Sequence, residues 1–515
     1  MCLHLMAPAL GLLGGLAQAG SAPGYLRPGT ARVGGVRHLC LIYHGQQSRV
    51  EWTADALLPY VAYVDADGEP RDWLFDSFLL IEFATDSGVS LHHHPEGAPP
   101  PTVADWEWLA DAWFRERTGL AGLERAFARA GRALGDQNRR GRVVLTLPIP
   151  FREDRAFGPL PGSESKLDFA QPVDQHEALA WYVDRVVRDW RARDYPHLDL
   201  VGFYWVAETI PPEYEPLVQW TARHLHRQGL KLYWIPYYGA QGLDRWRAMG
   251  VDAVMLQPGH FFTQERNEQQ LATAAQLARA QGAGIEMEFD GRAIDDEDYR
   301  RRYWGYLDAG AKYGWMREAV LGYYEGGGAV RMFVQQPERA RPLYEALYRF
   351  VQGRYTPSGQ VELPNLPSPP PVRRGNLALA RRGATIEGCV RRDDQPDLAP
   401  EKVIDGEVDW YGGMSGFGYL PVGGSFTITL PRPVRVARTQ VLLFDLDDRF
   451  FRYRVETSAD GERWETAVDK SEGEWSGWQV DRFSARTARY VRFTGLHNSV
   501  NDLVQVVEFE VYSRP

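Results

Sequence analysis

The 515-residue chain contains few cysteines and no arrangement of them that would staple a small fold. The three are Cys2, Cys40 and Cys389, and no CxxC pair or Cys/His ligand cluster occurs. A disulfide framework and a structural zinc site are therefore not expected. Cys40 lies in an apolar segment and Cys389 lies far away in the chain, so we expect both to be free thiols.

Long apolar runs and an excess of positive charge are also missing. Beyond the N-terminus no run reaches the ~20 residues that span a bilayer, so no membrane span is expected. The net charge is −10, which argues against nucleic acid as a partner. Residues 1–22 contain an apolar run and then Ala17-Gln-Ala19, although no Lys or Arg precedes Arg27. This pattern predicts a signal peptide and a secreted, periplasmic or cell-surface protein.

Aromatic residues are abundant, with 17 Trp and 25 Tyr. Sugars present apolar C–H faces edged with hydroxyls, which match the flat face and polar tip of Trp and Tyr. The abundance therefore favours a carbohydrate partner. The alternative is that these side chains fill hydrophobic cores.

Short apolar segments alternate with helical segments over residues 30–355. The expected strands are residues 38–44, 73–82, 142–149, 199–208, 232–238, 253–257, 285–290 and 319–324. Eight such repeats predict an α/β fold, a (β/α)₈ TIM barrel. A doubly wound open sheet is the alternative, but it needs a Gly-rich phosphate turn after its first strand, and Tyr43-His-Gly-Gln46 is not one.

A proline-rich stretch over residues 356–374 is expected to be a semi-rigid linker. Beyond it, residues 375–515 show short segments with period-two alternation, such as 425–430, 451–457 and 489–493. This pattern predicts a C-terminal β-sandwich.

Acidic residues occur near the ends of the fourth and seventh expected strands. Glu208 ends the fourth, and Glu286, Glu288 and Asp290 take alternate positions on the seventh. Two carboxylates at these strand ends face each other across the mouth of a closed barrel. Such a pair can protonate a glycosidic oxygen and attack the sugar. The alternative is that all of them are surface or salt-bridge residues.

The spacing of these acids gives each a predicted role. We predict that Glu208 is the general acid/base and Glu288 the nucleophile. Glu286 lies deeper, paired with Arg331 or another base, and remains an alternative nucleophile because strand ends are uncertain by ~2–4 residues. Asp290, at the lip, would bind substrate hydroxyls.

Other polar and aromatic residues at strand ends are candidates for substrate binding. Each of them alone is more often structural than functional. They are Tyr43, His44, Glu82, Tyr204, Trp205, Tyr237, Tyr238, Gln257, His260 and Glu325.

The C-terminal part resembles the discoidin, or coagulation-factor type C, modules. The matching segments include 376–378, 403–406 followed by Trp410, 457–461 followed by Trp464, and 488–493. In bacterial secreted enzymes such modules mostly bind carbohydrate, and many carry a structural calcium. The resemblance implies Asp405 and Glu508 as calcium ligands. Loop residues that would contact the glycan are Trp410, Tyr411, Tyr419, Arg449 and Phe450, although Trp410 could instead be a core residue.

The barrel resembles an uncharacterised bacterial family of glycoside-hydrolase-like barrels, of the domain of unknown function 4855 type. The matching segments are 75–78, 202–205 with Glu208, 233–238, 257–258 and 286–290. In layout it is similar to retaining glycosidases with the acid/base on strand four and the nucleophile on strand seven. Those enzymes usually have Asn before the acid/base to bind the sugar 2-hydroxyl. This chain has Ala207, so that contact must come from elsewhere.

Together these patterns predict an exported glycoside hydrolase, retaining in mechanism, that acts on a polysaccharide or glycan without a catalytic cofactor. One alternative is a noncatalytic glycan-binding or surface protein with an inactive barrel. Another is an inverting enzyme with a different acid pair. Carboxyl separations of about 5–5.5 Å indicate retention, and about 6.5–9.5 Å indicate inversion.

Overall fold

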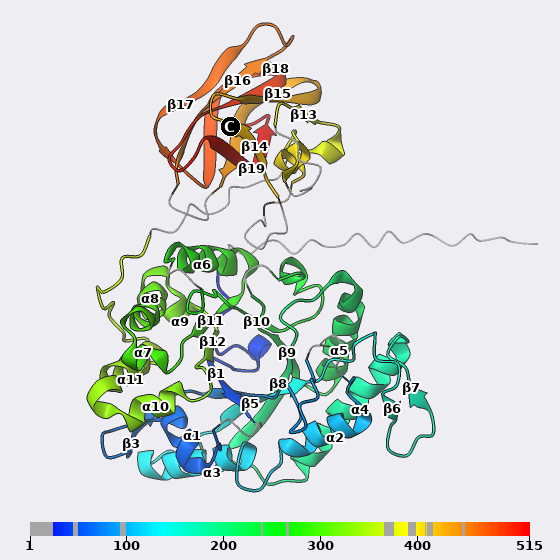
Figure 1. Cartoon of the computed structure of the whole chain (residues 1–515), viewed down its shortest axis with the longest axis vertical. Helices are drawn as coiled ribbons and strands as arrows, with labels where there is room; N and C mark the ends of the chain where they lie inside the picture. The colour runs from blue at the N-terminus through cyan, green and yellow to red at the C-terminus, as the bar shows by residue number, and fades with distance from the viewer. Residues whose placement is uncertain are drawn as a thin grey trace, which may run out of the picture.

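The protein is described as a computed structural model that places residues 24–44, 50–92, 99–237, 240–263, 267–364, 375–389, 398–406, 408, 416–444 and 449–515. It consists of an α/β part followed by an all-β part (Figure 1). Both follow from the change in hydrophobic periodicity along the chain.

Eight parallel strands form a closed barrel, as predicted (Figure 1). The first barrel strand pairs with the second and with the last, which closes the ring. In chain order the strands are β1 (His38–Tyr43), β4 (Ser77–Ile81), β5 (Gly141–Leu147), β8 (Leu198–Trp205), β9 (Lys231–Trp234), β10 (Ala253–Leu256), β11 (Gly284–Glu288) and β12 (Leu321–Tyr324). The fourth and seventh barrel strands are therefore β8 and β11.

Helices surround this barrel and connect its strands. They are α1 (Ala54–Val61), α2 (Val103–Ala112), α3 (Leu120–Leu134), α4 (Pro172–Arg191), α5 (Glu215–Arg227), α6 (Gln269–Gln281), α7 (Arg292–Asp295), α8 (Glu297–Tyr313), α9 (Trp315–Glu318), α10 (Ala329–Gln335) and α11 (Pro337–Val351). Between β9 and β10 the described residues form a 3₁₀ turn, η3 (Leu243–Arg245), and no α-helix.

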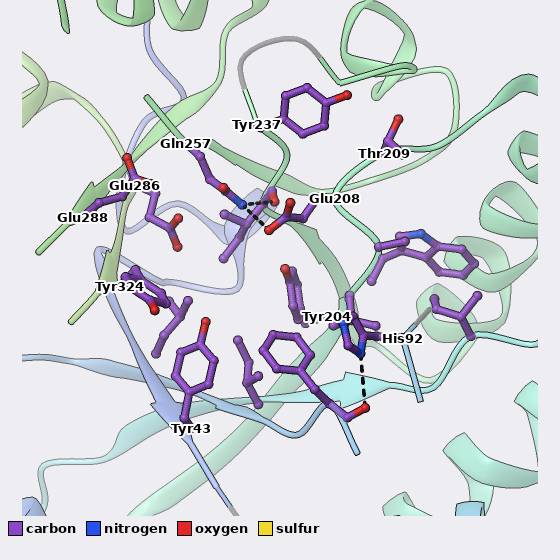
Figure 2. Close-up of a pocket in the computed structure, with 18 of the residues that line it drawn as sticks. Tyr43, His92, Tyr204, Glu208, Thr209, Tyr237, Gln257, Glu286, Glu288 and Tyr324 are labelled. Carbon is purple, nitrogen blue, oxygen red and sulfur yellow. Dashed lines mark hydrogen bonds between the residues drawn. The ribbon is translucent and has the colours of Figure 1, made fainter. Parts of the chain in front are cut away.

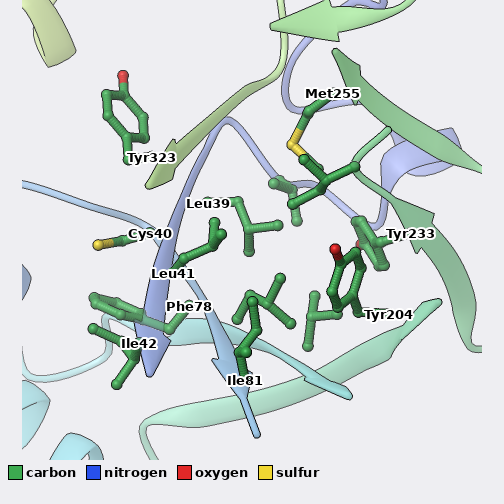
Figure 3. Packing of buried hydrophobic residues seen from close by; sticks show 14 of the residues in the cluster. Leu39, Cys40, Leu41, Ile42, Phe78, Ile81, Tyr204, Tyr233, Met255 and Tyr323 are labelled. Atoms are coloured by element: carbon green, nitrogen blue, oxygen red, sulfur yellow. The ribbon is translucent and has the colours of Figure 1, made fainter. Parts of the chain in front are cut away.

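The barrel strands are apolar on both faces because helices cover the outside and side chains fill the inside. On β1, Leu39 and Leu41 point to one side and Cys40 and Ile42 to the other (Figure 3). All four are at most 3% exposed. Complete burial of such aliphatic side chains stabilises a fold by about 1.5–3 kcal/mol each.

Several barrel strands end earlier than the sequence indicates. β8 ends at Trp205, β9 at Trp234 and β11 at Glu288. Pro236 has no N–H for a further ladder hydrogen bond, which explains the short β9. Asp290 instead accepts a hydrogen bond from the backbone N–H of Arg292 at 2.8 Å, where α7 begins. The chain therefore leaves the barrel wall before Glu208 and Asp290.

The C-terminal part is antiparallel, as predicted. Its strand order is β14 (Gly418–Pro421), β19 (Leu503–Tyr512), β15 (Ser425–Leu443), β18 (Trp478–Asn498), β16 (Phe451–Ser458) and β17 (Glu465–Trp475), and β13 (Thr385–Glu387) pairs with β15. The long β15 and β18 shift register twice, so the sheet bends around an apolar core. Phe426 stacks on Phe493 there, with ring centroids 5.0 Å apart.

The beginning of the proline-rich linker is fixed against α8. Lys312 Nζ donates to the carbonyl of Leu363 and Tyr313 Oη to that of Pro364, both at 2.6 Å. The rest of the linker and residues 1–22 lie outside the described residues. In the part of the chain that is placed, no helix is long and apolar enough to cross a bilayer, and Cys40 and Cys389 are free thiols.

Candidate active site

A cavity of about 1200 Å³ opens at the carboxyl ends of the barrel strands, where barrel enzymes carry their active sites. Each barrel strand, or the loop that follows it, contributes to its wall (Figure 2). The polar and aromatic lining residues are Tyr43, Phe83, His92, Phe151, Glu153, Tyr204, Trp205, Glu208, Thr209, Tyr214, Tyr237, Gln257, Phe262, Glu286, Glu288 and Tyr324. The three predicted catalytic acids are thus in one cavity.

Glu208 reaches the cavity from the loop three residues beyond β8, and its side chain is exposed. Gln257, which follows β10, donates from Nε2 to Glu208 Oε1 at 3.2 Å and to the carbonyl of Ile235 at 2.9 Å (Figure 2). The amide therefore ties the loop carboxylate to the end of β9. Tyr204 and Trp205 line the cavity nearby and are buried.

Glu286 and Glu288 stand at alternate positions of β11 and both line the cavity. They are 3% and 5% exposed. Glu288 accepts hydrogen bonds from the hydroxyl of Tyr306 on α8 and from the backbone N–H of Gly259, the latter at 2.6 Å. No hydrogen bond to Glu286 Oε1 is found among the described residues.

The predicted partner of Glu286 lies elsewhere. Arg331, on α10, lines a separate hollow with Thr53 and Gln335. The side chains that act electrostatically on Glu286 are Glu288 and Glu208, and both are acidic. Glu286 is therefore a buried acid without the base that the sequence interpretation gave it.

Burial decides the protonation of the two β11 acids. Desolvation raises the pKa of Glu286 well above its usual value, and the charges of Glu288 and Glu208 raise it further. Desolvation also raises the pKa of Glu288, to about 7, because the Tyr306 and Gly259 donors oppose it only in part. The protonated form is thus favoured more strongly at Glu286 than at Glu288, whose pKa is about 7.

Three predicted cleft residues are fully or almost fully buried and do not line the cavity: His44, Glu82 and Glu325. Each follows directly on a residue that does: Tyr43, Ile81 and Tyr324. Neighbouring side chains on a strand point to opposite faces, so only one of each pair can face the barrel mouth. The other packs toward the helices.

His44, Glu82 and Glu325 contact neighbouring residues of the fold and do not face the cavity. His44 packs against Trp113, with ring centroids 5.8 Å apart. Glu82 Oε1 accepts the backbone N–H of Phe83 at 3.0 Å. Glu325 accepts the hydroxyl of Tyr60 at 2.9 Å and the N–H of Gly328 at 2.7 Å, at the start of α10. Burial raises the pKa of Glu325 to about 8.

Asp290 and His260 also lie off the cavity. Asp290 forms an ion pair with Arg292 at 2.7 Å. His260 is fully buried, and its Nδ1 lies 2.9 Å from the carbonyl oxygen of Asn267. Tyr237 lines the cavity and is 40% exposed, whereas Tyr238 lies outside the described residues.

Sequence reasoning missed part of the cavity wall. Tyr306, which does not line the cavity but donates to Glu288, was also not expected, because a Tyr on a helix such as α8 carries no signal that it reaches a strand residue. Tyr324 could have been found, since it alternates correctly with the barrel-facing positions of β12. The other polar and aromatic lining residues that were missed are Tyr214, on the 3₁₀ turn η2 (Pro212–Tyr214), and, on loops, Phe83, His92, Phe151, Glu153, Thr209 and Phe262.

The C-terminal module carries one pair of predicted metal ligands. Glu508 is fully buried and accepts the N–H of Gly406 at 3.1 Å, beside Asp405. Asp405 itself lies 3.6 Å from Lys402 Nζ. Within the placed residues, no group of three or more His, Cys, Asp or Glu side chains is arranged to hold a metal. Any cation here would need backbone carbonyl ligands, which calcium accepts.

The structure describes three of the five predicted glycan-contact residues of the module. Arg449 stacks over the ring of Phe444 at 4.3 Å, and Phe450 lies 5.3 Å from the ring of His497. Tyr419 is on β14, paired in register with Gln505 of β19. Trp410 and Tyr411 lie outside the described residues.

Residues 390–509 match the F5/8 type C domain model. The curated BTB/POZ domain-containing protein 9 of Rattus norvegicus is 27% identical over 140 residues, which are 27% of this chain and 23% of that protein. The Homo sapiens protein is 26% identical over the same shares. The matched part thus spans about a quarter of the length of these relatives.

Solved carbohydrate-binding modules match the same quarter of the chain. One is CBM32 of AlyQ in complex with 4,5-unsaturated mannuronic acid, with 22% identity, 25% of this chain, 93% of that chain and a TM-score of 0.21. Another is chitosan-binding module 1 of a chitosanase/glucanase from Paenibacillus sp. IK-5, with 22% identity, 27% of this chain, 99% of that chain and a TM-score of 0.22.

The barrel has its own family match, over residues 38–349. This range takes in all eight barrel strands from end to end, and it contains Glu208, Glu286 and Glu288. Because it covers more than half of the chain, the protein belongs to the family described as Domain of unknown function (DUF4855).

Proposed function

We propose that the barrel is a retaining glycoside hydrolase in which Glu208 is the general acid/base and Glu288 the nucleophile. The observation that carries this proposal is one cavity with carboxylates on opposing walls, from the loop after β8 and from β11. Retaining glycosidases need this pair, one to protonate the leaving oxygen and one to attack the anomeric carbon.

Hydrogen-bond donors favour Glu288 over Glu286 as the nucleophile. A nucleophilic carboxylate must be ionised, and donors stabilise that form. Glu288 receives two, from Tyr306 and Gly259, whereas Glu286 Oε1 receives none among the described residues. Glu286 would remain protonated beside it.

The solvent-facing position suits Glu208 for acid/base work. This group must give a proton to the leaving oxygen and then take one from water, so it needs access to both. Gln257 holds it by one hydrogen bond and lines the same cavity as Ala207, the position at which glycosidases of similar layout have Asn. The Gln257 amide would supply the contact to the sugar 2-hydroxyl.

The C-terminal module would bind the same polymer and hold the barrel on it. Its family match supports this role, and Tyr419, Arg449 and Phe450 are its proposed contacts. A calcium ion between Asp405 and Glu508 would tie the 405–406 turn to β19. Its test is the melting temperature of the full chain with calcium and with EGTA, where a calcium-dependent rise is expected and no change would refute the ion.

The N-terminal segment 1–22 would direct export, since its apolar run ends at Ala17-Gln-Ala19. Expression in a bacterial host and mass spectrometry of the mature N-terminus test this. Cleavage near Ala19 is expected. An intact segment in the cytoplasmic fraction would contradict it.

Hydrolysis is tested with the full chain and the variants Glu208→Gln and Glu288→Gln on a broad glycan panel. The wild type should release shorter products whose newly formed anomeric centre, followed by NMR, keeps the configuration of the substrate. Both variants should lose turnover. Unchanged turnover in both would refute the mechanism, and inverted configuration would leave a hydrolase with another acid pair.

A noncatalytic glycan-binding barrel is the second candidate. Ala207 favours it, because an active acid/base site of this layout usually has an amide donor at that position. In that case the wild type would bind glycans tightly, and mass spectrometry would detect no cleavage products.

A further inference from the structure

The cavity wall is strongly one-sided in charge. Its carboxyl groups belong to Glu153, Glu208, Glu286 and Glu288. No Lys or Arg lines the cavity among the residues that the structure places, and the one imidazole is that of His92. A uronate or sulfated sugar would meet only like charge here, which disfavours binding.

Glu286 is the most buried member of this group. It is 3% exposed, it lines the cavity, and Figure 2 shows it on the opposite side of the hollow from Glu208. No described residue hydrogen-bonds to its Oε1. A buried carboxyl without partners costs free energy unless something else satisfies it.

The groups that face Glu286 offer no positive charge. They are Glu288 on the same strand, Glu208 after β8, Tyr204 on β8, Tyr306 on α8 and Tyr324 on β12. Each is an acid or a phenol. Among the residues that the structure places, none supplies a counter-charge to Glu286, and a cationic ligand would do so.

Aromatic rings next to this acid also favour a cation. Tyr324 meets Tyr43 and Phe262 edge to face, with ring centroids 5.4 Å apart in both pairs. The faces of such rings attract ammonium groups. A sugar with an amino group would thus find a carboxylate and aromatic faces in the same cavity.

We propose, building on the hydrolase function above, that the substrate is a glycan with free amino groups, and that Glu286 binds the sugar ammonium. A charge-assisted hydrogen bond between ammonium and carboxylate is about twice as strong as a neutral one. An N-acetylated sugar has no charge to offer, so the de-N-acetylated form is the preferred ligand.

Binding should release a proton. Burial and the neighbouring acids raise the pKa of Glu286 well above its usual value, which favours the protonated carboxyl in the empty cavity. When the sugar –NH₃⁺ enters, the carboxyl becomes carboxylate, and its proton passes to the buffer. No covalent bond changes, and the released proton gives a signal that an acetylated ligand lacks.

Isothermal titration calorimetry of full-length Glu208→Gln tests this without turnover. The probes are glucosamine and galactosamine oligomers, their N-acetylated counterparts and oligogalacturonate, each measured in phosphate and in Tris. We expect an amino oligomer to bind at least tenfold more tightly than its acetylated form, with a buffer-dependent enthalpy. Equal affinity or tighter binding of the uronate would overturn the proposal.

Two further variants attribute the preference to Glu286. Adding Glu286→Gln should remove the preference and the buffer dependence while leaving affinity for the acetylated oligomer within about threefold. Glu153→Gln, at the exposed rim, is the matched control and should keep most of the preference. A preference that survives Glu286→Gln would overturn the assignment, including the case in which the C-terminal module binds the amine.

The outcome for the hydrolase proposal is separate. Cleavage of neutral or uronate glycans that depends on Glu208 and Glu288 would refute the amine preference and leave the hydrolase intact. Amine binding through Glu286 without cleavage by the wild type would refute the hydrolase proposal and leave the amine preference intact.

Discussion

The two walls of the cavity carry their acids in different environments. Glu286 and Glu288 are within β11 and are almost fully buried, whereas Glu208 is on a loop beyond β8 and is exposed. Burial fixes a side chain by packing and shifts its ionisation, whereas a loop position leaves it in exchange with water. The comparison shows that one cavity can hold acids fixed by packing, Glu286 and Glu288, together with an acid in contact with water, Glu208.

The largest expected effect is a loss of kcat that differs between substitutions on the two walls of the cavity. Glu288→Gln should lower kcat about 10⁴-fold on every substrate, because no covalent intermediate can form. Glu208→Gln should lower it about 10²–10⁴-fold on natural glycans. On an aryl glycoside with an acidic leaving group the first step needs no proton, so Glu208→Gln should show a burst of the released phenol.

Burst kinetics in a stopped-flow instrument measure this difference. Glu288→Gln, which shows no burst, is the control. A burst in Glu288→Gln and none in Glu208→Gln would mean that Glu288 is the general acid/base and Glu208 the nucleophile.

A smaller effect concerns the donors that hold Glu288. Since the pKa of Glu288 is about 7, kcat/KM should rise with pH up to about 7 as the carboxyl ionises. Tyr306→Phe removes a donor that lowers this pKa, so the rising limb should move to higher pH by about one unit, or about tenfold in rate at pH 6. The pH profile of kcat/KM checks this.

A purely structural role of Tyr306 would give another result. It would lower kcat/KM equally at every pH. Such a uniform loss would contradict the hydrogen-bond argument.

The same contrast predicts that the buried acids make stability depend on pH and that the exposed Glu208 has little effect on it. A carboxyl whose folded pKa is raised binds more protons in the folded state, so stability falls as pH rises through the shifted range. For Glu288 that range runs from about 4.5 to 7, and for Glu325 from about 4.5 to 8. Wild-type stability should therefore decline across this range.

Neutral amides test which acids cause that decline. Glu286→Gln should stabilise the barrel at pH 8 by about 1–3 kcal/mol, because the amide does not ionise and so removes the cost of a carboxyl whose pKa is raised in the folded state. Glu208→Gln should change it by less than about 0.5 kcal/mol, since surface changes rarely do more. Denaturant unfolding at pH 5 and pH 8 measures both, and a larger effect at Glu208 would contradict the burial contrast.

Sequence periodicity predicted the barrel, its strand count and the C-terminal β domain. It also predicted that Glu208, Glu286 and Glu288 lie together at the carboxyl end of the barrel, because all of its parallel strands end there. It failed where two adjacent residues were both assigned to the cleft, as with Tyr43, which lines the cavity, and His44, which does not. It also failed past strand ends, where Asp290 turns to α7, since turn geometry depends on local hydrogen bonds that period-two patterns do not record.

The smallest expected effect tests that alternation rule at the end of β12. Tyr324 faces the cavity, whereas its neighbour Glu325 lies beneath the start of α10 and is bonded to Tyr60 and Gly328. Glu325→Gln should therefore change kcat/KM by less than about twofold and stability by about 1 kcal/mol, because the amide keeps one acceptor for the Gly328 N–H. Tyr324→Ala, which removes a cavity wall, is the comparison and should raise KM about tenfold, since aromatic contacts of this kind are worth about 0.5–1.5 kcal/mol. Steady-state kinetics on the substrate found by the glycan panel measure both, and a greater loss at Glu325 would mean that the acid, and not its neighbour, faces the bound sugar.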